Sequence, residues 1–143
     1  MKYILLIGSY LLAFAINLMP SIKHPDSSIN IFNSVVTILF MVLLLMYAKK
    51  GSKLVKVFSI FGALSGVIVF VITTFEHAMI GNGILDVIAS IQYPFFLLFI
   101  TPLFGVNILF GLSYGLYALF MSLFYGMIVG LTVYSKKNED QVV

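Results

Sequence analysis

The stretch FEHAMIGNGILD, residues 75–86, carries ionisable side chains in an otherwise apolar chain. A second polar stretch, residues 20–30, carries one more histidine and one more carboxylate. Together they supply two imidazoles and three carboxylates, a donor set that suits zinc or another divalent cation and that can also transfer protons. The spacing matches no established metal motif, so no metal is assigned. The candidate binding residues are His24, Asp26, Glu76, His77 and Asp86.

These residues can also be explained as an ordinary outer loop without a site, because any loop outside a membrane needs polar side chains. The chain has no cysteine, which excludes disulfides, thiolate nucleophiles and cysteine-bound zinc or iron–sulfur clusters. It also lacks HExxH, GxGxxG, Walker and GxSxG motifs. We therefore assign no catalytic residue and no cofactor.

The composition indicates a membrane protein. The 143 residues are 62% hydrophobic and only 9% charged, whereas soluble domains are about 25% charged. The simplest organisation is one all-α transmembrane domain, residues 1–143, whose first partner is the lipid bilayer. The net charge of +3 comes from lysines spread along the chain, so topology explains it better than nucleic-acid binding does.

Four apolar runs predict the spans, because a helix crosses a bilayer with about 20 residues. The last run, residues 93–134, is too long for one span, and its second half makes a good span alone. The expected spans are residues 3–19, 31–48, 57–75 and 111–134.

Residues 93–107 are predicted to be a broken or re-entrant segment. Pro94 and Pro102 interrupt helical hydrogen bonding, and Gly105 and Asn107 favour a turn. Irregular backbone at membrane depth is tolerated where protein buries it or where it lines a cavity. The alternative is a fifth span, which would place the two termini on opposite sides.

Lysine placement predicts the orientation, since lysine-rich short loops face the cytoplasm. With four spans, every lysine except Lys23 falls on the side of the N-terminus. Both termini are therefore expected in the cytoplasm, and the five candidate binding residues outside. The lysine-for-arginine usage is typical of an AT-rich bacterial genome, so the expected location is a bacterial cytoplasmic membrane. A signal peptide ending near Ala13-Phe14-Ala15 is the alternative for the N-terminus.

Small residues recur at helical spacing in the last span, while large ones such as Tyr117 fall elsewhere. Small residues let neighbouring backbones approach closely in lipid, within one chain or between chains. The third span holds a matching pair. The predicted helix-packing residues are Gly62, Gly66, Gly111, Gly115, Ala118, Ser122, Gly126 and Gly130.

The sequence is compatible with three functions. Little chemistry and many small residues favour an accessory, assembly or immunity-type subunit that contacts another membrane protein or a second copy of itself. An oligomeric small-molecule or ion transporter or channel is the alternative, with the broken segment lining a path. A membrane-embedded enzyme at the outer leaflet would require the His and acidic residues to converge.

Overall fold

The computed structural model describes residues 2–142 and is all-α, with no strand in that range. Five of its helical stretches are long and apolar enough to cross a membrane. Four are regular helices and the fifth, Gly83–Phe110, consists of five short pieces. The regular helices are α1 (Ile4–Ile22), α2 (Ile31–Lys49), α3 (Lys53–Met79) and α7 (Tyr114–Val142). The pieces are α4 (Gly83–Ser90), α5 (Gln92–Phe95), the π-helix η1 (Phe96–Ile100), the 3₁₀-helix η2 (Thr101–Val106) and α6 (Asn107–Phe110).

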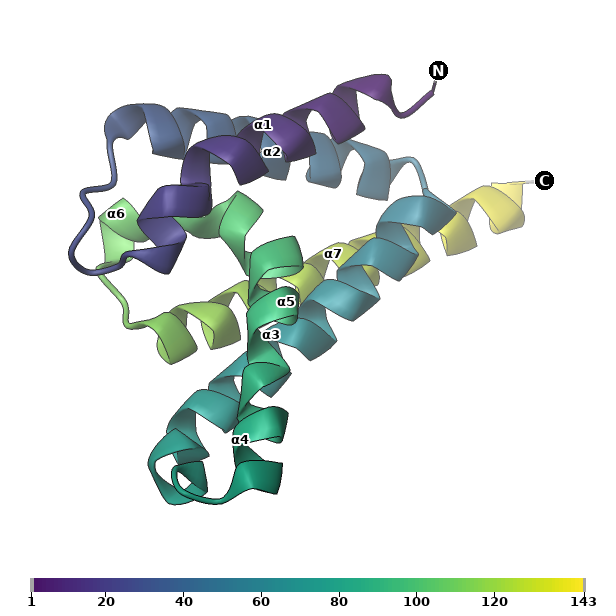
Figure 1. Cartoon of the computed structure of the whole chain (residues 1–143). Helices are drawn as coiled ribbons and strands as arrows, with labels where there is room; N and C mark the ends of the chain where they lie inside the picture. Colours follow the sequence, from purple (N-terminus) through teal and green to yellow (C-terminus); the bar gives the residue numbers. More distant parts are fainter. Residues whose placement is uncertain (1, 143) are drawn as a thin grey trace.

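Helices α3 and α7 form the most extensive packing in the described chain. Gly62 faces Tyr125, and Gly66 faces Ala118 and Ser122. Residue numbers rise along one helix as they fall along the other, so the two helices are antiparallel (Figure 1). Helices α1 and α2 form a second antiparallel pair, and η2 packs against both of its members.

The segment Gly83–Phe110 enters the bundle and returns to the same end. Near its start, the Thr73 hydroxyl donates to Gln92 Oε1 close to the C-terminal end of α3 (3.1 Å). Midway, the Phe99 ring lies 5.2 Å from that of Phe58, near the middle of the bundle. The segment then passes beside Ser34, at the beginning of α2, whose hydroxyl donates to Gly105 O (2.7 Å). Its path is therefore re-entrant, although its length alone would allow a fifth span.

The predicted break at residues 93–107 is confirmed, since the helix there changes from α to π to 3₁₀. Residues 101–107 are all buried, as irregular backbone inside a bilayer requires. The expected spans leave residues 76–92 as a loop between two membrane segments, but most of this range is helical. Helix α3 continues to Met79, and α4 begins at Gly83, where the Asn82 side chain caps Ile84 N (3.2 Å).

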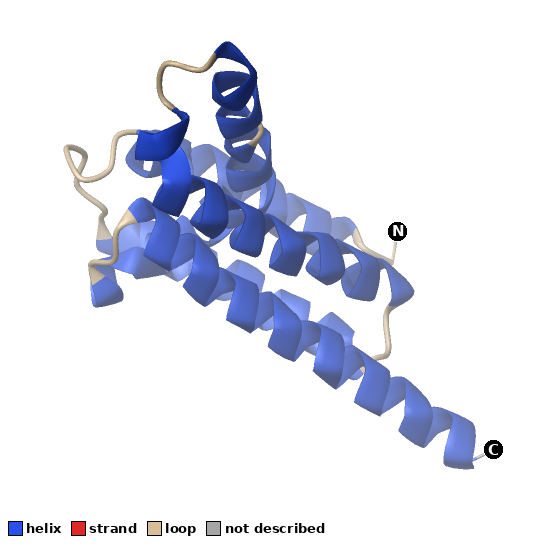
Figure 2. Cartoon of the chain, turned by 90° about the horizontal axis from the view of Figure 1, so that it is seen from below, coloured by secondary structure: helices blue, strands red, loops and turns tan. Residues whose placement is uncertain are grey.

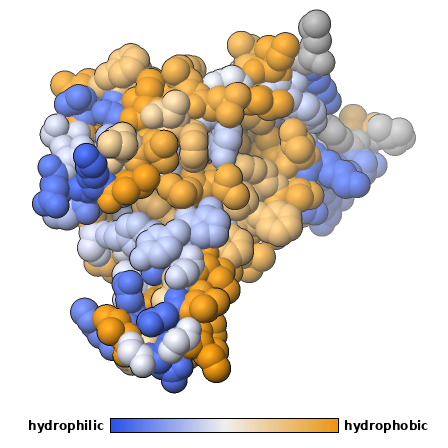
Figure 3. All heavy atoms as spheres, viewed as in Figure 1, coloured by the Kyte–Doolittle hydropathy of each residue, from blue (hydrophilic) through white to orange (hydrophobic). Residues whose placement is uncertain are grey.

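Lysine residues gather at the end of the bundle opposite the Gly83–Phe110 segment. There the Tyr47 hydroxyl donates to Lys2 O (2.6 Å), and Gly51 lies against Lys136. The N-terminus, the α2–α3 turn and the C-terminal part of α7 thus meet at one end (Figures 1 and 2). Figure 3 shows hydrophobic side chains over most of the visible face and hydrophilic ones gathered toward its edges.

Candidate functional site

The five candidate binding residues lie in two places. The His24 ring, partly buried after α1, packs edge-to-face on Phe104 with ring centroids 5.4 Å apart, and Asp26 is exposed nearby. Glu76 and His77 lie in the last turns of α3, and Asp86 is exposed in the first turn of α4. No three His, Asp or Glu side chains in the described residues are placed to hold a metal ion. Convergence on one ion therefore has no structural support.

The predicted helix-packing residues divide into a packed group and an open group. Those near or on α7 form what we call the glycine stripe: Gly111, Gly115, Ala118, Ser122, Gly126 and Gly130. A Cβ at Gly66 would collide with Ala118 O and lie 2.7 Å from Ser122 Cβ, and one at Gly62 would lie 2.6 Å from the Tyr125 ring. A Cβ at Gly115 would lie 3.1 Å from Thr73 Cβ. At Gly66 the two helix backbones lie close together, whereas Gly62 and Gly115 leave room for a facing side chain of the other helix.

Gly126 and Gly130 do not pack within the chain, because an added Cβ would meet nothing within 4 Å at either position. The reason is helical geometry: a step of four residues turns a helix about 40° beyond a full circle. Successive steps from Ser122 therefore rotate the stripe away from α3. Gly111 also faces open space, and it serves a turn before α7 with φ +58°.

Large residues of α7, among them two tyrosines, occupy the helix positions outside the stripe. Tyr117 and Tyr125 are completely buried, and Tyr117 lies off the stripe, as expected, but packs against the irregular segment. The Tyr117 hydroxyl donates to Leu103 O, and the Tyr125 hydroxyl donates to Phe99 O at 2.6 Å. Both phenols thus reach from α7 to the irregular segment.

Proline frees a further carbonyl in this segment. Pro102 has no N–H, so Leu98 O loses the donor four residues ahead. The Tyr10 hydroxyl replaces it, at 2.9 Å. Pro20 has the same effect inside α1, where Asn33 Nδ2 donates to Ile16 O at 3.1 Å. Helix α1 continues through Pro20 to Ile22 and does not stop at residue 19 as expected.

Two buried asparagines join α1, α2 and the irregular segment. Asn33 Nδ2 donates to Asn17 Oδ1 (3.1 Å), and Asn17 Nδ2 donates to Thr37 Oγ1 (2.8 Å) and Pro102 O (3.3 Å). The Ser21 and Thr101 hydroxyls share another hydrogen bond, at 3.0 Å. We call Asn17, Ser21, Asn33, Ser34, Thr37 and Thr101 the polar core. Its bonds to Thr101, Pro102 O and Gly105 O fasten the broken segment to α1 and α2, and its other bonds join α1 to α2 or lie within one of these helices.

Sequence reasoning missed the structural role of Tyr10, Tyr117 and Tyr125. The available signal was a tyrosine in the middle of an apolar run, where its hydroxyl needs a partner. Pro102 frees the acceptor of Tyr10, but pairing a given tyrosine with a given carbonyl requires the tertiary structure. Compared with known proteins, the chain matches no family model, no curated protein and no solved structure.

Proposed function

We propose that this chain is a multi-pass membrane protein that acts by helix contact, as an accessory, assembly or immunity-type subunit. The observation that carries the proposal is the hydrogen bonding of the buried polar side chains. Among the described residues, Ser59 Oγ is the one buried side-chain nitrogen or oxygen without a hydrogen-bond partner. The polar core thus stabilises the fold and leaves little polar capacity for a substrate, so surfaces remain the means of action.

The contact surface that we favour is an apolar groove between α2 and α7. It has a volume of about 520 Å³ and adjoins α6. Three of its lining residues are methionines, Met41, Met121 and Met127. Met127 is 55% exposed, and its flexible side chain can adapt to a partner helix. The open Gly126 follows Leu123, another lining residue, by one turn of α7. A partner helix, or a second copy, could approach closely on this side.

Cysteine cross-linking tests the proposal, since the chain has no native cysteine. Single Leu123→Cys and Met127→Cys variants report on the groove, and Leu64→Cys, 55% exposed on α3, is the control. We expect oxidation in native membranes to give a discrete cross-linked product from the groove positions and none from the control. Products from no position, or equally from all three, would overturn the assignment of this surface.

Transport is the second candidate, favoured by one observation, the re-entrant segment with asparagines at its break. Discontinuous helices of this kind line the sites of many transporters. Reconstituted vesicles tested for ion and small-solute flux distinguish the two functions. Flux that Asn17→Leu abolishes would replace the contact proposal with transport. We expect no flux above empty vesicles.

We further propose that the membrane is a bacterial cytoplasmic membrane and that both termini face the cytoplasm. The lysines at one end support this, since short cytoplasmic loops are rich in lysine. The same orientation places His77 and Asp86 outside. An enzyme at the outer leaflet remains the third candidate from sequence, without a converging cluster to support it.

A further inference from the structure

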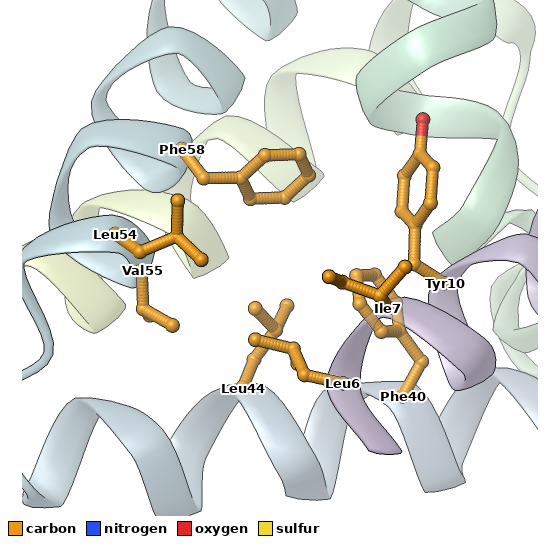
Figure 4. A pocket seen from close by; sticks show the side chains of 8 residues that line it. All are labelled: Leu6, Ile7, Tyr10, Phe40, Leu44, Leu54, Val55 and Phe58. Carbon is orange, nitrogen blue, oxygen red and sulfur yellow. The ribbon is translucent and has the colours of Figure 1, made fainter. Parts of the chain in front are cut away.

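A second apolar cavity, separate from the groove and the polar core, opens between α1 and α3. Its volume is about 230 Å³, below the range of about 300–1,000 Å³ that holds a whole drug-sized ligand. Figure 4 shows side chains of three helices facing one another around it. The lining residues are Leu6, Ile7 and Tyr10 of α1, Phe40 and Leu44 of α2, and Leu54, Val55 and Phe58 of α3.

The cavity has a buried floor and an open mouth. Leu6, Leu44 and Val55 are at most 6% exposed and form the floor. Ile7 and Leu54 are 52% and 47% exposed and form the lips of the mouth. Apolar lips and an apolar floor select a hydrocarbon chain that comes sideways from the bilayer.

A polar cluster lies one helical turn from this floor. Tyr3, Tyr47 and Ser52 are each three residues away from Leu6, Leu44 and Val55, about 4.5 Å along a helix. The Tyr3 and Tyr47 rings are 5.4 Å apart, and the Ser52 hydroxyl donates to Tyr3 Oη at 3.2 Å. This cluster caps the cavity at the lysine-rich end of the bundle.

Two lysines are held over this cap. Lys2 Nζ lies 5.8 Å from the centre of the Tyr3 ring, and Lys50 Nζ lies 5.6 Å from that of Tyr47. Such cation–π contacts leave the remaining faces of an ammonium free to meet an anion. A hydrocarbon slot ending under two cations complements an anionic amphiphile.

We infer that the cavity binds one anionic glycerophospholipid from the surrounding bilayer. One acyl chain fills the space between Ile7 and Leu54, and the phosphate lies against Lys2 and Lys50. The other lysine group at this end is different. Lys53, Lys56, Lys136 and Lys137 line a groove between α3 and α7 together with Asp140, whose carboxylate offsets part of their charge.

Tryptophan quenching tests this inference, because the chain contains no native tryptophan. A Leu54→Trp variant places the reporter at the mouth, and Leu64→Trp, on the same helix and away from the cavity, reports bulk lipid. Both are reconstituted in nanodiscs with increasing brominated phosphatidylglycerol or brominated phosphatidylcholine of identical acyl chains. Ile7→Trp, on the opposite lip, is the second reporter should Leu54→Trp fail to fold.

We expect Leu54→Trp to be half-quenched at a lower mole fraction of the anionic lipid, by about fivefold for each lysine that contributes. Leu64→Trp should respond equally to both lipids. Adding Lys2→Gln with Lys50→Gln should remove the preference, whereas adding Lys136→Gln with Lys137→Gln should keep it.

Three outcomes would overturn the inference. Equal quenching by both lipids at the mouth would mean that the cavity accepts any acyl chain. No quenching at the mouth would mean that no chain enters. An equal loss of preference in both lysine pairs would mean that general surface charge attracts the lipid without a defined site.

Discussion

At the residue scale, prolines and tyrosines of this chain act together. Proline removes an N–H and frees the carbonyl four residues earlier. In the low-dielectric interior of a membrane protein, that carbonyl needs another donor. Tyr10 supplies one at Leu98 O and Asn33 supplies one at Ile16 O. Side-chain donors from distant parts of the sequence thus make the breaks tolerable.

Tyr125→Phe should lower stability by about 1 kcal/mol, because it leaves Phe99 O buried without its donor. Thermal unfolding in detergent measures the change. The control is Tyr134→Phe. The Tyr134 side chain is 65% exposed, so the loss of its hydroxyl should change stability little. A Tyr125→Phe protein as stable as wild type would show that the bond contributes nothing net.

Gly66→Ala and Gly126→Ala should have opposite effects on stability. The new methyl at Gly66 meets Ala118 O and Ser122, so α3 and α7 must separate, at a cost of about 1–3 kcal/mol. The methyl at Gly126 meets open space, and alanine favours the helix by about 1 kcal/mol over glycine. Unfolding of the purified protein in mild detergent compares them. Equal destabilisation by both would contradict the assignment of Gly126 to an outward face.

At the element scale, η1 and η2 are stable only because other helices surround them. Short π and 3₁₀ pieces have poorer hydrogen-bond geometry than an α-helix. The buried residues from Thr101 to Asn107 pack against α1 and α2 and against Tyr117 of α7. Gly105 lies directly against the backbone of α2 at Asn33. A Cβ at Gly105 would overlap Asn33 O, so glycine is required by this close approach.

Asn33→Ala should destabilise the irregular segment more than it destabilises the rest of the bundle. It removes the donor to Ile16 O and the donor to Asn17 Oδ1, leaving buried acceptors that cost about 1–3 kcal/mol each. Hydrogen exchange by mass spectrometry should show faster exchange in residues 96–106 than in α3 or α7. The control is Asn138→Ala, on the exposed C-terminal part of α7. Uniform acceleration along the chain would instead indicate global destabilisation.

At the scale of the whole molecule, both described ends of the chain lie at one end of the bundle, with the α2–α3 turn. The helical hairpin formed by the end of α3 and α4 lies at the other end. Helix α4 has no buried residue, and it exposes Ile84 and Val87 at 76% and 66%. An even number of crossings follows if α1, α2, α3 and α7 each span the bilayer.

Cysteine labelling in intact cells tests this topology. Val142→Cys should resist a membrane-impermeant maleimide until the cells are opened, and Asp86→Cys should react at once. Both side chains are exposed in the structure, at 88% for Val142. A difference in labelling would therefore report which side of the membrane each residue faces. Labelling of Val142→Cys from outside, with Asp86→Cys also labelled, would indicate a fifth crossing by Gly83–Phe110.

The sequence by itself determined the helical class, four of the helices and the irregular segment. These follow from local quantities: the length of each apolar run, the positions of proline, and the gathering of lysines. It also predicted close packing at Gly62, Gly66 and Gly115, because small residues at helical spacing predict backbone contact in lipid. The function and the candidate site stay predictions, since polar loops carry no spacing that identifies their chemistry.

Only the tertiary structure decided what depends on distant parts of the chain. It showed that Gly115 packs against α3 and that Gly126 does not. The part of the stripe that meets α3 depends on the direction in which α3 crosses α7. It paired Tyr10 with Leu98 O across 88 residues of sequence, and it placed His24 on Phe104 rather than beside His77. It also joined Tyr3, Tyr47 and Ser52 into one cap over the α1–α3 cavity. Such neighbours are set by how helices cross, and the period of a single helix does not contain that information.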